Sequence, residues 1–299
     1  MASSFKTIDP KDIVSTRNLL HEAIPITGTI VSGTYAENNI KNYTHGMFQS
    51  VYDYPFLSSS ANHIIDLTAG YPAASALSAS TNNQNAKKIN IYNEMAQVLA
   101  GFDQDGNVRR FDKDGNFGTT GDEINEAFFF NFTRLLAKDE IKKGSFSITL
   151  GTGPNYPFPF ATDIDITDAS GSNGFKVNSP AGEYGILFAK NGTGTPMGTS
   201  GDIGTIGMPC GLLFYQAGIA VVTASVFSSI TGALGGGLLT LATQMGAPDW
   251  DGEAGYVNAM LTGSGISGSC DGIRHRIKNI SFNNTTELNS TIYFCRASH

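Results

Sequence analysis

Two copies of a short acidic unit are the part of this 299-residue sequence best suited to bind a metal ion. The unit Phe-Asp-x-Asp-Gly-Asn begins at Phe102 and again at Phe111. Carboxylate and amide oxygens at alternate positions, followed by Gly and a more distant Glu, are the ligands of helix–loop–helix calcium sites. Counted from the second unit, such a site would use the side chains of Asp112, Asp114, Asn116 and Glu123.

The calcium interpretation has a weak point at the sixth loop position. That position needs a positive φ and is nearly always Gly, but it is Phe117 here, and the first unit has Val108. The dipeptides Asp105-Gly106 and Asp114-Gly115 are strong signals for tight hairpin turns, which need no metal. The sequence therefore favours two successive turns, followed by a helix that begins near Asp122, over a calcium site.

The other candidates for chemistry are weaker. Residues 263–268, GSGISG, match the dinucleotide fingerprint by letter, but their Gly/Ser-rich surroundings predict a turn region rather than a strand–turn–helix unit. The histidines form no HxxxH or HxH pair, and GxSxG and P-loop motifs are absent. A hydrolase would need paired carboxylates in a cleft, whereas the one tight acidic cluster outside the repeat resembles strand-edge residues: Asp163, Asp165 and Asp168. We therefore expect no enzymatic activity and no cofactor.

The composition indicates a β-rich structural protein. Charged residues form only 15% of the chain, Gly contributes 35 residues and the net charge is −7. Few and scattered basic residues argue against a nucleic-acid partner. Cys210, Cys270 and Cys295 have no CxxC spacing, so we expect buried thiols rather than a zinc site or disulfides. The first residues contain no signal-peptide pattern, which predicts assembly in a reducing cytoplasm.

Helical patterns are confined to the first half of the chain. Residues 10–24 predict a short helix with Pro at its first turn. Residues 88–101 place apolar side chains on one helical face and end at Gly101. Residues 122–143 begin with acids and end with lysines, as a helix dipole favours. A helix–loop–helix is therefore expected near residues 88–143.

From Ser145 onward, strand patterns alternate with glycine turns. Ile280 and Phe282 precede an Asn-Asn-Thr-Thr sequence, and apolar residues alternate again from Leu288, which predicts a terminal β-hairpin. The expected fold class is α+β and mainly β. Its parts are an N-terminal mixed β region (1–87), a helix–loop–helix insertion (88–144) and a C-terminal antiparallel β-sandwich or barrel-like domain (145–299).

The segment from Ile203 to Pro248 contains no charged residue. Its β-branched residues predict a central core strand around Leu212–Phe227, and its glycines and serines argue against a membrane-spanning helix. The Gly-rich residues 232–245 lack the bulk to form their own core. We expect them to form a loop that packs on another subunit through Leu234, Leu238, Leu239 and Leu241.

Four stretches resemble virion structural proteins of tailed bacteriophages that infect marine bacteria, mostly contractile-tailed phages related to the T4 group. They are HGMFQSVYDYPFLSSSANHIIDLTAGY (45–71), FFFNFTRLLAKDEIKKGSF (128–146), SPAGEYGILF (179–188) and RIKNISFNNTTELNSTIYFCRA (276–297). The resemblance runs over essentially the whole chain and implies a structural role in the tail, baseplate or neck. Similar proteins often continue past FCRA into further strands, so the final strand here is expected to pair with something outside the chain.

The expected function is therefore that of an oligomeric virion component that contacts other virion proteins and is assembled in the host cytoplasm. An alternative is a receptor-recognition module that binds a host-surface glycan. Such a module would use exposed aromatic side chains, for which the candidates are Tyr52, Tyr54, Phe56 and Trp250. The same residues could equally form core or subunit contacts.

Overall fold

The computed structural model describes residues 8–24, 39–117, 123–136, 139–152, 162–191, 207–227, 261–263, 265–274 and 276–295. These residues form a mainly β protein, as the sequence predicted, with one 13-stranded antiparallel sheet. The strands are β1 (Ile13–Ile24), β2 (Ile40–Asn42), β3 (Gln49–Tyr52), β4 (His63–Gly70), β5 (Ala127–Asn131), β6 (Glu140–Ile141), β7 (Ser147–Thr152), β8 (Thr162–Thr167), β9 (Lys176–Ser179), β10 (Gly182–Asn191), β11 (Met208–Phe214), β12 (Ile219–Thr223) and β13 (Ile277–Tyr293).

Helices are few. The α-helices are α1 (Asn85–Leu99), α2 (Gly171–Gly174) and α4 (Ile266–Arg274), and the 3-10 turns are η1 (Pro10–Asp12), η3 (Thr133–Leu135) and η4 (Ala224–Phe227). The helix predicted over residues 88–101 is confirmed as α1. It ends as expected, since Gly101 has a φ of +79° and its N–H donates to the carbonyl of Ala96 over 2.8 Å.

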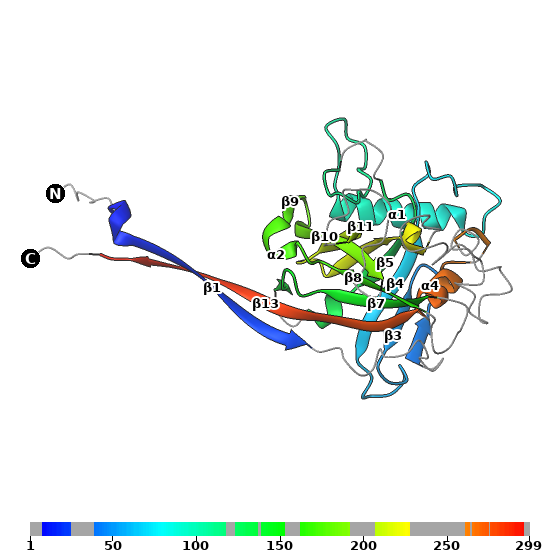
Figure 1. The fold of residues 1–299 in the computed structure, drawn as a ribbon, viewed down its shortest axis with the longest axis horizontal. Helices are drawn as coiled ribbons and strands as arrows, with labels where there is room; N and C mark the ends of the chain where they lie inside the picture. Colours follow the sequence, from blue (N-terminus) through cyan, green and yellow to red (C-terminus); the bar gives the residue numbers. More distant parts are fainter. Residues whose placement is uncertain are drawn as a thin grey trace, which may run out of the picture.

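The strand order is β1-β13-β7-β8-β10-β11-β12-β5-β4-β3-β2, with β6 on β13 and β9 on β10. Strands from the beginning, middle and end of the chain therefore share one sheet. In Figure 1 this sheet and its helices form a body, and the ribbon made by β1 and the end of β13 projects away from it. The first and last described residues lie at the tip of that ribbon.

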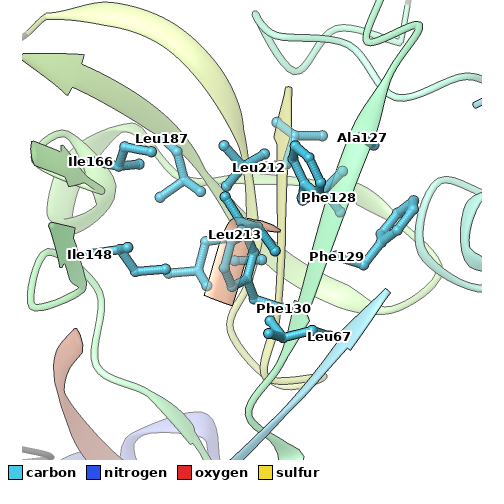
Figure 2. Packing of buried hydrophobic residues seen from close by; sticks show 14 of the residues in the cluster. Leu67, Ala127, Phe128, Phe129, Phe130, Ile148, Ile166, Leu187, Leu212 and Leu213 are labelled. Carbon is cyan, nitrogen blue, oxygen red and sulfur yellow. The ribbon is translucent and has the colours of Figure 1, made fainter. Parts of the chain in front are cut away.

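The hydrophobic core lies inside the curve of the sheet. Side chains of β7, β8 and β10 point toward those of β4, β5 and β11, as Figure 2 shows for Ile148, Leu187, Leu213 and Phe130. This arrangement resembles a sandwich because the two halves of one curled sheet face each other. Phe128 and Phe130 alternate with Phe129, which points to the opposite face.

The opposite face of the sheet is covered by α1 and by the loop that follows it. The ring centre of Tyr92 on α1 lies 6.3 Å from that of Phe129 and 5.4 Å from that of Phe111. The hydroxyl of Tyr92 donates to the carbonyl of Ile124 and accepts from the N–H of Phe111. The loop is thereby fixed against both the helix and the sheet.

Two helix predictions are wrong. Residues 10–24 form the single turn η1 and then β1, because Ile13–Ile24 pair along their whole length with β13. Residues 123–143 contain β5, η3 and β6 instead of the second helix of the predicted helix–loop–helix. The Phe-rich run 127–131 is extended because both of its faces are buried, which favours a central strand over an amphipathic helix.

The predicted hairpin at the C-terminus is also wrong. Residues 283–286 continue straight through as part of β13 rather than turning. Their backbone is held on one edge by residues 20–23 of β1 and, at Asn284 and Thr285, on the other edge by β6. The alternation on which the prediction relied is satisfied equally well by one long strand.

The described part of the charge-free segment, residues 207–227, lies at the centre of the sheet, as predicted, but it forms two strands rather than one. β11 and β12 are joined by a tight turn in which Gly218 has a φ of +64°. No helix in the described part of the chain combines the length and apolar character needed to cross a membrane. The four leucines predicted to contact another subunit, Leu234, Leu238, Leu239 and Leu241, lie outside the described residues.

Candidate functional site

The acidic repeat forms two turns, as predicted. In the first, the Asp103 carboxylate accepts hydrogen bonds from the N–H groups of Asp105 (2.9 Å) and Asn107 (2.8 Å), and Gly106 has a φ of +82°. These bonds lower the pKa of the Asp103 carboxyl, the contact with Asn107 being the largest cause. Both of these stabilising hydrogen bonds lie within the turn itself.

The second turn corrects the argument against calcium. Phe117 does adopt a positive φ, of +52°, and its ring packs 5.3 Å from that of Tyr184. The objection based on backbone conformation is therefore wrong. The Asp112 carboxylate accepts from the N–H of Asp114 (3.1 Å), and the Asp114 carboxylate accepts from the N–H of Asn116 (3.0 Å).

Glu123, the twelfth residue of the candidate calcium loop, lies 3.9 Å from the guanidinium of Arg110. Its backbone forms a β-bridge with that of Asp112. Within the described residues, no three His, Cys, Asp or Glu side chains are grouped to hold a metal ion. The described side chains of the loop are thus engaged in turn and bridge contacts.

The acidic cluster after Ser145 is divided between surface and interior. Asp163 forms an ion pair with Lys278 (2.6 Å), and Asp165 accepts from the hydroxyl of Thr149 (2.7 Å). Both lie on β8, as expected of strand residues. Asp168, in contrast, follows the strand and is buried.

Asp168 fastens three segments of the body. Its carboxylate accepts from the N–H of Gly144 (2.7 Å), the N–H of Phe146 (2.9 Å) and the hydroxyl of Tyr215 (3.1 Å). Burial raises the pKa of Asp168 from 3.8 to about 6, although these hydrogen bonds favour the ionised form. With its oxygens occupied by structural donors, Asp168 has the geometry of a structural carboxylate.

The segment that resembles a dinucleotide fingerprint contains a helix rather than the predicted turn region. α4 begins at Ile266, whose N–H donates to the side-chain oxygen of Gln84 over 2.9 Å. The thiol of Cys270 on α4 donates to the carbonyl of Leu67 on β4. The helix therefore packs on the sheet with its first turn capped by a side chain.

The three cysteines differ in exposure according to whether they lie in the body or in the projecting ribbon. Cys210 and Cys270 are buried, as predicted, and burial raises the pKa of both thiols. Cys295 is exposed, contrary to the prediction. It lies in the projecting ribbon.

We call this ribbon the terminal arm and define it as residues 8–20 and 286–295. Residues 13–20 of β1 pair with residues 286–293 of β13, in register from Ile13–Tyr293 to Leu20–Thr286. At about 3.3 Å per residue, the paired part is roughly 26 Å long. Beyond Thr285, β13 pairs with no described strand other than β1, and β1 is the last strand of the sheet. Both edges of the arm are thus unpaired within the described chain.

Apolar side chains lie on both faces of the terminal arm. Because Val14 is directly opposite Ile292, the two share a face, and alternation places Leu288 and Phe294 on the same face. Tyr293 and Ile13 share the other face. All six are among the exposed large hydrophobic residues of the protein, together with Ile8 at the tip.

A second feature, the aromatic pocket, lies at the β2–β4 end of the sheet and consists of two adjoining chambers. The Tyr chamber has a volume of about 270 Å³ and is lined by Tyr43, Phe48, Ser50, Tyr52, His63, Asp66 and Arg134. The Met chamber has a volume of about 360 Å³ and is lined by His45, Met47, Phe48, Asp66, Thr68, Ile91, Glu94, Met95, Phe129 and Asn131. Phe48 and Asp66 line both chambers.

Strand pairing brings the polar groups of this pocket together. Ser50 on β3 is directly opposite Asp66 on β4, and the register shifts just beyond, where Tyr52 pairs with His63. The Ser50 hydroxyl donates to the Asp66 carboxylate, and the His63 Nε2 lies 2.7 Å from the same oxygen, Oδ1. Serine and histidine therefore contact one carboxylate oxygen instead of each other. This geometry does not activate the serine as a nucleophile, so the cluster is suited to binding.

Aromatic rings surround these polar groups on two sides. Tyr43 stacks on His45 at 5.1 Å and lies 4.7 Å from Phe48, while Tyr52 lies 5.1 Å from His63. Burial is the main cause that raises the pKa of the Tyr52 hydroxyl. Tyr52 therefore enters the pocket as a neutral group with one apolar ring and one polar end.

Of the aromatic residues proposed for glycan contact, the structure brings two together. Phe56 lies 6.2 Å from Tyr52, whereas Tyr54 is exposed and does not line the pocket. Trp250 lies outside the described residues. Sequence reasoning missed Asp66 and Arg134, which come from different segments. The polar residues His63 and Asp66 within an otherwise largely apolar strand were the one available signal. A period of two would place them on opposite faces, and the register shift between β3 and β4 brings them together.

Scans against protein-family models, curated proteins and solved structures found no match to this chain.

Proposed function

We propose that this chain is a structural component of a tailed-bacteriophage particle, in the tail, baseplate or neck, and that it forms homo-oligomers through its terminal arm. The exposed terminal arm is the observation that carries the proposal. The resemblance of four sequence stretches to virion structural proteins supports it from the sequence side. The chain acts through protein–protein contacts and catalyses no reaction.

The terminal arm is poorly suited to exist alone in water. A two-stranded ribbon without a covering layer is marginally stable, and unpaired strand edges readily pair with other chains. Seven large apolar side chains of the arm are exposed by between 37% and 57%. At about 200 Å² for a fully exposed side chain of this size, they present roughly 650 Å² of apolar surface. This is close to the ~800 Å² that each partner buries in a stable interface.

A second copy of the chain is the partner that this surface fits best. Most soluble oligomers are built from identical chains, and a twofold contact uses the same patch on both. The face with Val14, Leu288, Ile292 and Phe294 is mainly apolar, and the residues of the two strands that share it by register, Thr16, Asn18 and Ser290, are uncharged. Two such faces can pack together without burying a charge. In the particle, the same contact would fix neighbouring copies to each other.

The test of the arm contact uses sedimentation of the purified full-length chain. Replacing Ile292 and Phe294 by Asp should convert oligomers to monomers, because each charge would be buried in the contact. The matched control is Val177→Asp, which changes an exposed aliphatic residue on β9 of the body. The oligomer should persist in the control. An oligomer unchanged in the arm variant would contradict the proposal.

Cys295 provides an independent readout, because it is the exposed cysteine of the arm while Cys210 and Cys270 are buried. A maleimide probe on Cys295 should be protected in the oligomer and react freely in the arm variant. The phage role is tested by mass spectrometry of purified particles, which should contain several copies of the chain. Absence of the chain from particles, or a robust hydrolytic activity, would overturn that role.

A further inference from the structure

We propose that the aromatic pocket binds a saccharide ring that carries a small substituent with an apolar methyl end, such as an N-acetyl group. The proposal does not depend on the terminal arm, because the pocket lies in the body, on β3, β4, β5, α1, η3 and the loop between β2 and β3. It assigns the two chambers different tasks. The Tyr chamber holds the ring, and the Met chamber takes the substituent.

The Tyr chamber has both aromatic and polar walls, which suit the apolar C–H patches and the polar hydroxyls of a sugar. A pyranose ring has patches of C–H groups that pack on aromatic side chains and a rim of hydroxyls that form hydrogen bonds. Tyr43, Phe48 and Tyr52 supply the aromatic surface and are each partly exposed. A volume of about 270 Å³ is near the lower limit for small-molecule sites and suits a single ring.

The polar groups of the chamber have unused capacity for hydroxyls. Asp66 accepts from Ser50 and His63 through Oδ1, and its Oδ2 has no hydrogen-bond partner among the described residues. Arg134 likewise forms no hydrogen bond or ion pair within that part of the chain. The two charged groups line one chamber without neutralising each other by a direct ion pair. A sugar hydroxyl can donate to the carboxylate while a neighbouring one accepts from the guanidinium.

The Met chamber favours a substituent that ends in a methyl group. Met47, Ile91, Met95 and Phe129 give it apolar walls. The hydroxyl of Thr68 donates to the carbonyl of Met47 over 2.6 Å, so it competes little for ligand. A methyl or acetyl group bound there would remove apolar surface from water on both sides.

Charge disfavours the main alternative, a phosphorylated ligand. Asp66 lies between the chambers and Glu94 lines the Met chamber, so two carboxylates face any ligand that spans them. One guanidinium, that of Arg134, stands against them. A neutral saccharide meets no such repulsion, and its hydroxyls satisfy groups of both signs.

The primary experiment is saturation-transfer NMR with the purified full-length chain and two probes. These are the methyl β-glycosides of N-acetylglucosamine and of glucose. We expect saturation of both rings and of the acetyl methyl, and at least tenfold tighter binding of the N-acetyl glycoside in titrations. No transfer to either probe would overturn the proposal. Equal affinities would overturn the role of the Met chamber.

Paired variants distinguish a built site from general surface binding. Arg134→Gln and Tyr52→Ala should each weaken binding of the N-acetyl glycoside at least tenfold. Their controls, Arg109→Gln and Tyr54→Ala, change the same residue types outside the pocket and should bind normally. Circular dichroism verifies that each variant is folded. Equal losses in variants and controls would sink the assignment.

A final experiment distinguishes a free sugar from a surface polysaccharide as the natural ligand of the pocket. The chain is passed over an immobilised polymer of N-acetylglucosamine, with and without the free glycoside as competitor. Retention that the free glycoside abolishes supports a polysaccharide ligand bound in this pocket. Retention that persists in Arg134→Gln would place polymer binding elsewhere and count against the pocket as its site.

Discussion

One strand, β13, belongs to two regions of the molecule that behave differently. Its residues 277–285 lie in the body, where residues 277–281 pair with β7 and residues 282–285 pair with β1, and its residues 286–293 lie in the terminal arm. Ile280 and Phe282 in the body are 0% and 2% exposed, whereas Ile292 and Phe294 in the arm are 50% and 55% exposed. Both halves alternate in the same way. Alternation therefore specifies which side chains share a face, while the neighbouring elements decide whether that face is covered.

The two halves of β13 differ in whether other elements pack on their apolar side chains, and not in the types of residue that they contain. In the body, Phe282 lies 5.6 Å from Phe132 and 6.2 Å from Phe146, so three rings share one cluster. In the arm, the described contacts are those between the two strands, such as the 3.4 Å contact of the Ser15 and Thr291 hydroxyls. Apolar burial is the dominant favourable term in folding. The arm accordingly needs a partner to gain what the body obtains from its own chain.

Hydrogen exchange along β13 should give the largest contrast. In the dilute monomer, amides in residues 277–285 should open with nearly the full unfolding free energy, of order 5–15 kcal/mol. Amides in residues 286–293 should open at about 1–2 kcal/mol, because a lone ribbon frays. Mass spectrometry of peptides from each half measures the difference. Equal protection of both halves in the monomer would remove the distinction between body and arm.

Truncating one aromatic side chain in each region should give the next largest difference. Phe130→Ala, in the interior of the curled sheet, should lower the free energy of unfolding by about 3–5 kcal/mol, because it leaves a cavity. Phe294→Ala should change the stability of the monomer by less than about 0.5 kcal/mol. Urea unfolding measures both. In the oligomer, however, Phe294→Ala should weaken association.

A pH change should act on the body. The pKa of Asp168 is raised from 3.8 to about 6, so between these values the folded chain binds more protons than the unfolded chain. This carboxyl therefore contributes most stability below about pH 4, and the contribution falls as pH rises to about 6, by up to about 3 kcal/mol.

Urea unfolding at pH 4.5 and 6.5 measures how steeply the free energy of unfolding falls as the pH rises; we call this change the pH slope. Asp168→Asn should abolish the part that is due to this carboxyl, and Asp165→Asn, on the exposed side of β8, should preserve it. A slope that persists in Asp168→Asn would show that another group is responsible. The rate of hydrogen exchange of the arm amides, corrected for its intrinsic pH dependence, should not change with pH in the way that the stability of the body does.

The smallest effect is expected in the first turn of the acidic repeat, which is exposed like the arm but holds itself together. Gly106 has a φ of +82° and open space where a Cβ would lie. Gly106→Ala should therefore cost about 1 kcal/mol, from backbone strain alone. Gly106→Asn is the control and should cost less, since Asn tolerates the left-handed region. Thermal unfolding checks both, and an equal loss would argue against strain.

What the sequence predicted well was local. The helix α1 was found because its apolar positions recur at helical spacing and Gly101 ends it. The turn at Asp103–Asn107 was found because its hydrogen bonds lie within five consecutive residues. The aromatic pocket was anticipated only in part, since Tyr52 was singled out as a contact residue but Asp66 and Arg134 were not.

The errors arose where a distant segment decided the outcome. Residues 127–131 lie within the segment 122–143, whose terminal charges fit a helix dipole, yet they pair with β4 and β12, and both faces of the Phe-rich run are buried. Residues 283–286 carried turn-forming types, yet β1, some 260 residues earlier in the chain, holds them extended. Local preferences are worth about 1 kcal/mol per residue or less, and strand pairing with burial exceeds them.

The sequence by itself determined that this protein is mainly β, that α1 ends at Gly101 and that the acidic repeat turns twice. Each of these depends on residues close together in the chain. Only the tertiary structure decided that the first and last strands pair as a projecting arm and that Ser50, His63 and Asp66 meet beside Arg134. The reason is physical: antiparallel pairing joins residues at any separation, and a period of two marks the face of a strand without naming its neighbour.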